Sequence, residues 1–357
     1  MSAPQQQGAA PQQPHHHPAP QTTVPLQGAA IEAESEENSE VDSTLGESDA
    51  SSFTTSLASS VVDYPYENGR RYHKFREGEY LYPNDEPEQD RLDMLHHIYR
   101  LMLGGSLHKA ALPPSPQRVI DLGTGTGIWA LDFADEYPSA TVEGVDLSPI
   151  QPRWIPPNCK FIVDDIEAEW PYPTEQAFDY IHQRNMVGSV GDWDRLYEQA
   201  YKHTKPGGYI ELQEFRVDFL SQQGPLPENS EINKWQKQIN AGTASFGKPL
   251  NVIEDLANKL KAAGFVDVHE DILKIPIGAW PKDKNLKLIG QFMQLHAIES
   301  VEPLTLALFT RVLGWTELEC QVLIGKVQEE FKTSRKQLFV YTHFITGRKA
   351  DRAHSED

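Results

Sequence analysis

A glycine-rich turn led by an acid, at residues 121–127, is the part of this sequence best suited to hold a ligand. It reads Asp-Leu-Gly-Thr-Gly-Thr-Gly, follows the apolar run 119–120 and precedes an apolar pattern of helical spacing. Glycines let the backbone turn tightly and approach a ligand where a Cβ would collide. Asp121 would repel a pyrophosphate but can accept hydrogen bonds from an ammonium group. The turn therefore favours a ligand with an amino-acid moiety, of which S-adenosylmethionine is the common one.

Further acids follow two predicted short strands, 141–145 and 160–163. Asp146 lies 25 residues after Asp121, near the spacing of roughly 20 residues at which an acid binds ribose hydroxyls in doubly wound nucleotide folds. Asp164 and Asp165 are placed to meet the adenine amino group. Each acid alone is equally typical of a helix cap or a solvated turn, but the ordered set predicts a cofactor site. We expect cofactor contacts from Asp121, Gly123, Thr124, Gly125, Gly127, Asp146, Leu147, Asp164, Asp165, Gln183 and Tyr72.

Methyl transfer from a sulfonium needs alignment more than acid–base groups, so it leaves few traces in a sequence. His182, Gln183 and Arg184 follow the predicted fourth strand, where the methionine end and the methyl acceptor should meet. His182 is the candidate general base, with an ordinary hydrogen-bonding histidine at a strand end as the alternative. Tyr72 either closes over the cofactor or packs its segment onto the domain.

Several stretches resemble the fungal LaeA-like class I methyltransferases. The likeness covers about residues 64–347 and is carried by 67–73, 83–93, 121–130, 144–152 and 205–211. The resemblance implies S-adenosylmethionine as cofactor and, for several relatives, nuclear control of secondary metabolism and development through partner proteins. One departure is Ser-Gln-Gln-Gly-Pro at 221–225, where many relatives have Ser-Asp-Asp-Gly-Thr.

Composition limits the other possibilities. The chain has 32 basic and 52 acidic residues, a formal net charge of −20, which disfavours direct binding to nucleic acid. Basic proteins and small neutral molecules are easier partners. Cys159 and Cys320 lie far apart without metal-ligand neighbours, so neither a disulfide framework nor a metal site is expected. Neither a secretion signal nor a membrane span is visible, and we expect a location in the nucleus, the cytoplasm or both.

The chain divides into four expected segments. Residues 1–60, which lack Lys and Arg and hold eight acids, should form a disordered acidic tail. An N-terminal arm and helix follow at 61–108, with the helix at about 87–104. A methyltransferase domain at 109–347 should contain a doubly wound, mostly parallel seven-stranded α/β sheet, and 348–357 a flexible C-terminus.

A helical insertion at 276–335 is expected before the last strand, with helices near 283–299, 302–313 and 317–332. Thr316 and Glu319 form a capping box for the last one. Four prolines among residues 148–157 predict a rigid loop over the cofactor instead of a helix.

Three functions remain open: a nuclear regulator in a protein complex, a methyltransferase of small metabolites, and a non-catalytic binding module. A metabolite enzyme predicts a closed apolar pocket under residues 276–332, and a regulator predicts an exposed apolar patch there. The intact glycine turn argues against the non-catalytic module.

Overall fold

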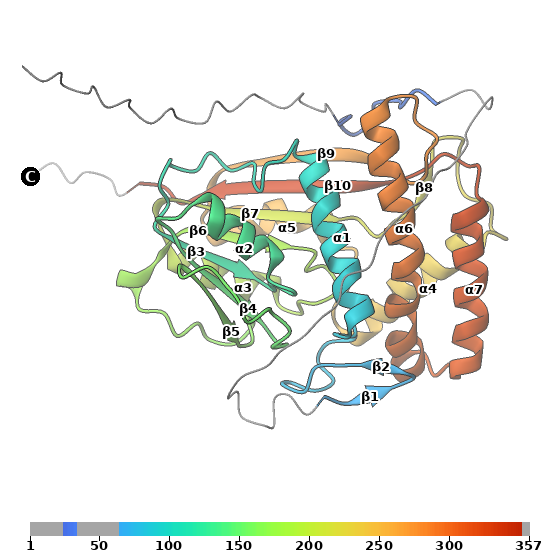
Figure 1. Ribbon diagram of the computed structural model, residues 1–357, viewed down its shortest axis with the longest axis horizontal. Coiled ribbons are helices and arrows are strands. Elements are labelled where there is room, and N and C mark those ends of the chain that lie inside the picture. The colour runs from blue at the N-terminus through green and yellow to red at the C-terminus, as the bar shows by residue number, and fades with distance from the viewer. Residues whose placement is uncertain (1–23, 34–63, 352–357) are drawn as a thin grey trace, which may run out of the picture.

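A mostly parallel sheet forms the centre of the computed structural model, which describes residues 24–33 and 64–351 (Figure 1). The strand order is β5-β4-β3-β6-β7-β10, with β9 and the two-residue β8 also paired to β10. β3 to β7 run parallel, and β10 is antiparallel to both β7 and β9. This is the expected doubly wound sheet, with β8 as an additional short strand. The strands are β3 (Arg118–Leu122), β4 (Thr141–Asp146), β5 (Cys159–Val163), β6 (Phe178–Arg184), β7 (Thr204–Phe215), β8 (Leu220–Ser221), β9 (Val266–Pro276) and β10 (Leu338–Arg348).

Helices cover both faces of this sheet. Figure 1 shows α2 in front of the strands and α5 behind them, while α1, α6 and α7 stand side by side next to the sheet. Their bounds are α1 (Glu86–Met102), α2 (Ile128–Glu136), η1 (Thr174–Gln176), α3 (Trp193–His203), α4 (Glu231–Phe246), α5 (Ile253–Ala263), α6 (Lys284–Ala307), η2 (Leu308–Val312) and α7 (Glu317–Thr333). In the described part of the chain, no helix is both long and apolar enough to cross a bilayer.

The insertion between β9 and β10 differs in one respect from the expected three helices. The first two are a single helix, α6, which continues through Pro303 and passes into a π-helical turn, η2. Proline removes one helical hydrogen bond, but Pro303 is buried, and α6 packs against α1 and α7. Tertiary packing therefore holds the helix together. The predicted capping box of Thr316 and Glu319 begins α7.

The N-terminal arm begins with a hairpin of β1 (Tyr66–Glu67) and β2 (Arg70–Arg71). Its turn places Asn68 and Gly69 at φ values of 50° and 77°, the left-handed region that a two-residue hairpin requires. Arg70 donates to both carboxylate oxygens of Asp85 at 2.7 and 2.8 Å. Because Asp85 also caps α1 by accepting from the Glu88 N–H, the hairpin and the helix are joined at one residue.

Residues 24–33 lie along the outer edge of the sheet, so the expectation of disorder for 1–60 does not hold there. The Gln27 N–H donates to the Ile272 carbonyl at 2.8 Å, and the Lys274 N–H to the Pro25 carbonyl at 2.8 Å. Val24 and Ile31 are buried. We call residues 24–33 the edge segment. The other residues of the expected tail, and most of the expected flexible C-terminus, lie outside the described residues.

Candidate active site

The carboxyl ends of β3, β4, β5 and β6 meet at one cleft, which encloses about 1020 Å³ of empty space, part of it open to solvent. Eight of the eleven residues expected to contact the cofactor line this cleft: Asp121, Gly123, Thr124, Gly125, Asp146, Leu147, Asp164 and Asp165. The strand order explains this, because parallel strands bring their carboxyl ends to the same edge of a sheet. Their contacts with the cofactor stay a prediction.

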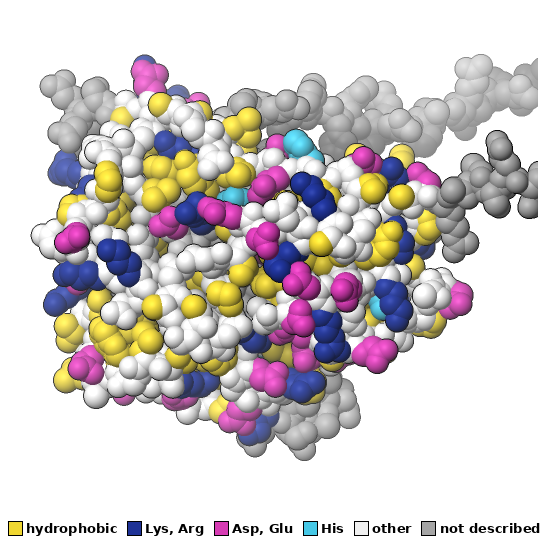
Figure 2. Space-filling model, turned by 180° about the vertical axis from the view of Figure 1, so that it is seen from behind, with side chains coloured by type: hydrophobic (Ala, Val, Ile, Leu, Met, Phe, Trp, Pro, Cys, Tyr) yellow, Lys and Arg dark blue, Asp and Glu magenta, His cyan; other side chains and the backbone are white. Residues whose placement is uncertain are grey.

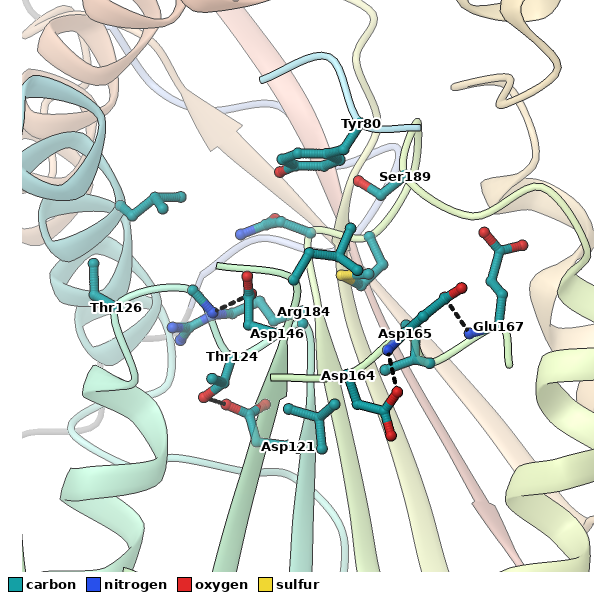
Figure 3. Close-up of a pocket in the computed structure, with 18 of the residues that line it drawn as sticks. Tyr80, Asp121, Thr124, Thr126, Asp146, Asp164, Asp165, Glu167, Arg184 and Ser189 are labelled. Carbon is teal, nitrogen blue, oxygen red and sulfur yellow. Dashed lines mark hydrogen bonds between the residues drawn. The ribbon is translucent and has the colours of Figure 1, made fainter. Parts of the chain in front are cut away.

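Asp146 at the end of β4 is fixed by the backbone (Figure 3). It accepts from the Gly125 N–H at 2.8 Å and from the Ser148 N–H at 2.9 Å. Burial raises the pKa of Asp146 to about 6, although these two N–H groups oppose the rise. Each carboxylate oxygen keeps a further lone pair. The arrangement suits the two hydroxyl groups of a ribose.

The glycine turn has little room for side chains. Gly127 precedes α2 at a φ of 81°, and a Cβ there would lie 2.4 Å from Cζ of Phe161. Gly127 does not line the cleft, so its place in the predicted set is corrected: it shapes the turn from behind. Gln151, from the proline-rich loop, donates to the Gly125 carbonyl at 2.7 Å and so also supports the turn.

Replacing Gly127 by Ala should destabilise the fold. We expect a loss of about 3 kcal/mol, because left-handed strain adds to a collision with the Phe161 ring. Gly247→Ala is the matched control: its φ is 88°, but nothing lies within 4 Å of the added Cβ, so it should cost about 1 kcal/mol. Urea unfolding of both variants measures the difference, and equal losses would contradict the expected collision.

His182 lies beneath the cleft and not in it. It is fully buried, its Nδ1 donates to Asp121 at 2.7 Å, and its ring stacks on Trp129 at 3.6 Å and 4°. A methyl acceptor in the cleft would meet Asp121, not this imidazole. His182 is therefore a positioning residue for Asp121, and the general base expected at this place is corrected.

Gln183 and Tyr72 also lie away from the cleft. Gln183 is fully buried and donates to Glu214 at 2.8 Å. Tyr72 is buried under Arg311, whose guanidinium lies 4.7 Å from the ring centre, so it packs the arm onto the insertion. The arm residue that lines the cleft is Tyr80, whose ring faces the acids from the opposite side (Figure 3).

Arg184 supplies a cation to the cleft. It lines the wall near Asn185 and Met186, donates to His96 Nδ1 at 3.1 Å and lies over the Tyr99 ring at 5.0 Å. No carboxylate of the described residues forms an ion pair with it, and burial lowers its pKa. A buried guanidinium without a counter-ion suits a ligand carboxylate.

The cleft thus offers three features to one ligand: hydroxyl-accepting Asp146, close-approach glycines and an unpaired cation. Together they fit the ribose and the amino-acid carboxylate of S-adenosylmethionine.

Comparison with known proteins agrees with this geometry. Residues 94–270 match the model of a methyltransferase domain family. The chain is 44% identical to methyltransferase pytC of Aspergillus terreus, over 82% of this chain and 90% of that protein. It is 39% identical to the secondary metabolism regulator LAE1 of Cochliobolus heterostrophus, over 79% and 94% of the two chains. Protein-methionine methyltransferase laeA of Emericella nidulans is 35% identical, over 79% and 76%.

The chain belongs to the fungal LaeA-like family of class I methyltransferases. It is an S-adenosylmethionine-dependent enzyme, and the cleft described above is where its residues fit that cofactor.

A second cavity adjoins the cofactor cleft of this methyltransferase. It encloses about 810 Å³ of empty space, part of it open to solvent, and shares four residues with the cleft: Tyr80, Leu92, Leu95 and Asn185. Helix α6 of the insertion forms one wall. We call it the apolar chamber, after its predominant lining by Leu92, Leu95, Val187, Phe215, Phe219, Leu250, Met293, Ala297, Leu304 and Val340.

Cofactor affinity should depend on pH through Asp146. Ribose hydroxyls donate best to the ionised carboxylate, so binding is full above the pKa of about 6 and weakens as the pH falls through it. We expect the affinity for S-adenosylhomocysteine to fall up to about tenfold per pH unit below that value. Calorimetry on the whole chain between pH 5 and 8 measures this, with Asp146→Asn as a control whose affinity should be flat. A constant wild-type affinity would contradict it.

Proposed function

We propose that this methyltransferase acts on a small, predominantly apolar molecule bound in the apolar chamber. The observation that carries the proposal is that the chamber opens to the cofactor cleft through shared lining residues. Its volume lies in the range of pockets that bury small ligands, which are mostly apolar with a few placed polar groups. Placing acceptor and methyl donor in adjoining cavities gives the alignment that methyl transfer needs.

Chemically, S-adenosylmethionine supplies an electrophilic methyl group on a sulfonium. The residues of the chain bind and orient: the glycine turn and Asp146 hold the nucleoside, Arg184 the carboxylate, and the chamber the acceptor. The acceptor's lone pair forms the new bond to carbon, the pair of the broken bond stays on sulfur, and a proton of a protonated acceptor leaves to solvent.

Labelled methyl transfer tests this proposal. The whole chain is incubated with methyl-tritiated S-adenosylmethionine and, separately, with an organic extract or the proteins of the native cell. We expect the label in the small-molecule fraction. Label only in protein would overturn the proposal.

A role as a nuclear regulator, as the name of LAE1 suggests for that relative, is the second candidate. An exposed apolar groove between α4 and α7 favours it: Leu318 and Val322 are 74% and 51% exposed, next to Trp315 and Leu323. Hydrophobic side chains also gather at the left edge of Figure 2, the side on which α4 and α7 lie. Such surface suits a protein partner.

Affinity purification from the native cell, followed by mass spectrometry, tests the regulatory role. Regulatory proteins should be recovered with the wild type and lost with Leu318→Asp. Gly125→Glu, which fills the cofactor cleft, shows whether the complex needs the cofactor. Recovery of metabolic enzymes alone would count against a regulator.

A further inference from the structure

A polar group interrupts the apolar chamber where α1 meets α6. Arg91 of α1 and His296 and Ser300 of α6 all line the chamber. The Arg91 Nη1 lies 3.4 Å from His296 Nε2 and 3.4 Å from Ser300 Oγ. His296 and Ser300 are 7% and 4% exposed. Polar side chains buried in an otherwise apolar wall are the kind that fix the orientation of a ligand.

The neighbours of His296 determine which ring nitrogen carries the proton. Arginine only donates, so Nε2, which faces Arg91, must accept. Burial, together with the charge of Arg91, lowers the pKa of His296 well below its ordinary value, so the ring is neutral. In a neutral imidazole with an accepting Nε2, the hydrogen lies on Nδ1.

That Nδ1–H has no hydrogen-bond partner among the described residues. A buried donor left unpaired costs free energy comparable to that of a lost hydrogen bond. Unpaired groups of this kind are uncommon in folded proteins. Its place in the wall of a ligand-sized chamber gives it a natural partner, an acceptor atom of the bound molecule.

We propose that His296 selects methyl acceptors with a carbonyl oxygen, which receives a hydrogen bond from Nδ1–H inside the apolar chamber. This inference depends on the small-molecule function proposed above and names the chemical class of its substrate: a predominantly hydrocarbon or aromatic molecule bearing a carbonyl group. His296 is here a specificity-determining residue.

The surroundings favour a neutral carbonyl over other polar groups. Arg91 is already paired with Glu88, at 2.8 Å for Nε and 2.5 Å for Nη2, so little net charge remains to attract a carboxylate. Ser300 donates to the His296 carbonyl at 2.6 Å, so its hydrogen is occupied. This part of the wall therefore presents donors only, and an ammonium group would find no acceptor in it.

A pair of probes that differ only at the carbonyl tests the inference. 2-Acetylnaphthalene and 2-isopropenylnaphthalene have nearly the same shape, with C=O in one replaced by C=CH₂ in the other. Calorimetry is performed with the whole chain saturated with S-adenosylhomocysteine. We expect the wild type to bind the ketone about tenfold more tightly than the alkene.

The variants locate the preference at one atom. His296→Leu should bind both probes alike, whereas His296→Asn, which keeps an N–H at the δ position, should retain part of the preference. His97→Leu, at an exposed histidine of α1, should behave as the wild type.

Equal binding of both probes by the wild type, or a preference that survives in His296→Leu, would overturn the inference and leave the small-molecule function standing. Failure of the folded chain to bind either probe would instead count against the small-molecule function itself, and with it the inference.

Discussion

Asp146→Ala should reduce the affinity for S-adenosylhomocysteine by at least about 100-fold. The substitution removes an acceptor of two ribose hydroxyls, and hydrogen bonds to a charged group contribute about 1.5–3 kcal/mol each. It also removes the acceptor of the Gly125 and Ser148 N–H groups, which loosens the glycine turn. Calorimetry with the whole chain measures the loss.

The control for this variant is Asp135→Ala, which removes an exposed carboxylate near the end of α2 and should leave the affinity unchanged. Asp146→Asn, which keeps one acceptor oxygen, should lie between the wild type and Asp146→Ala. An affinity for Asp146→Ala within threefold of the wild type, in a folded protein, would refute the assignment of Asp146 to the ribose.

Ala297→Phe should abolish methyl transfer to small molecules and leave cofactor affinity intact. Ala297 is buried on α6 and lines the apolar chamber but not the cofactor cleft. A phenyl ring there would occupy space that the acceptor needs, so we expect transfer to fall by about 100-fold or more, equivalent to about 2.7 kcal/mol. The measurement is tritium in the small-molecule fraction.

S-Adenosylhomocysteine affinity, measured on the same preparations, reports whether the cleft remains folded. Ala297→Leu should give a smaller loss of transfer, because it fills less of the chamber. Leu295→Phe, on the exposed side of the same helix, is the matched control and should transfer normally. Undiminished transfer by Ala297→Phe would mean that the acceptor binds elsewhere.

The acids that follow the strands could be predicted from sequence because their positions depend on local order. A strand followed by Asp121, Asp146 or Asp164 places the acid at the carboxyl edge of a parallel sheet, whatever the rest of the chain does. The capping box of Thr316 and Glu319 is local in the same way. These elements needed no knowledge of long-range packing.

His182 was misplaced because its environment is set by distant segments. It lies opposite Asp121 in the register of β3 and β6, and Trp129 of α2 covers its ring. Sequence shows only that a histidine ends a strand. The hydrogen bond and the stacking partner that remove it from the cleft come from other elements.

The choice between Tyr72 and Tyr80 could not be made from sequence either. Between them the chain turns at Arg76 and Gly78, both with positive φ, so no period of two or 3.6 residues relates the two rings. The apolar chamber was predictable only as a possibility under the insertion. Its walls come from α1, α6 and the loops after β6 and β7, whose meeting is a matter of tertiary packing.

The edge segment was missed because composition was averaged over sixty residues, which hides the apolar Val24, Leu26 and Ile31. Its side-chain contacts involve the departure noted at 221–225: Gln222 accepts from the Ile31 N–H at 2.9 Å and from Lys274 Nζ at 2.6 Å. An aspartate at this position could accept both hydrogens, but it could not donate to the Ile31 carbonyl as the Gln222 amide does at 3.0 Å.

This arrangement has a practical bearing on anyone shortening the protein. Trimming the acidic N-terminus back to residue 64 would strip β9 of the backbone partners that Pro25 and Gln27 now provide. Bare strand borders recruit other chains, so such a truncation invites self-association and precipitation, whereas beginning the protein at residue 24 keeps that flank sealed.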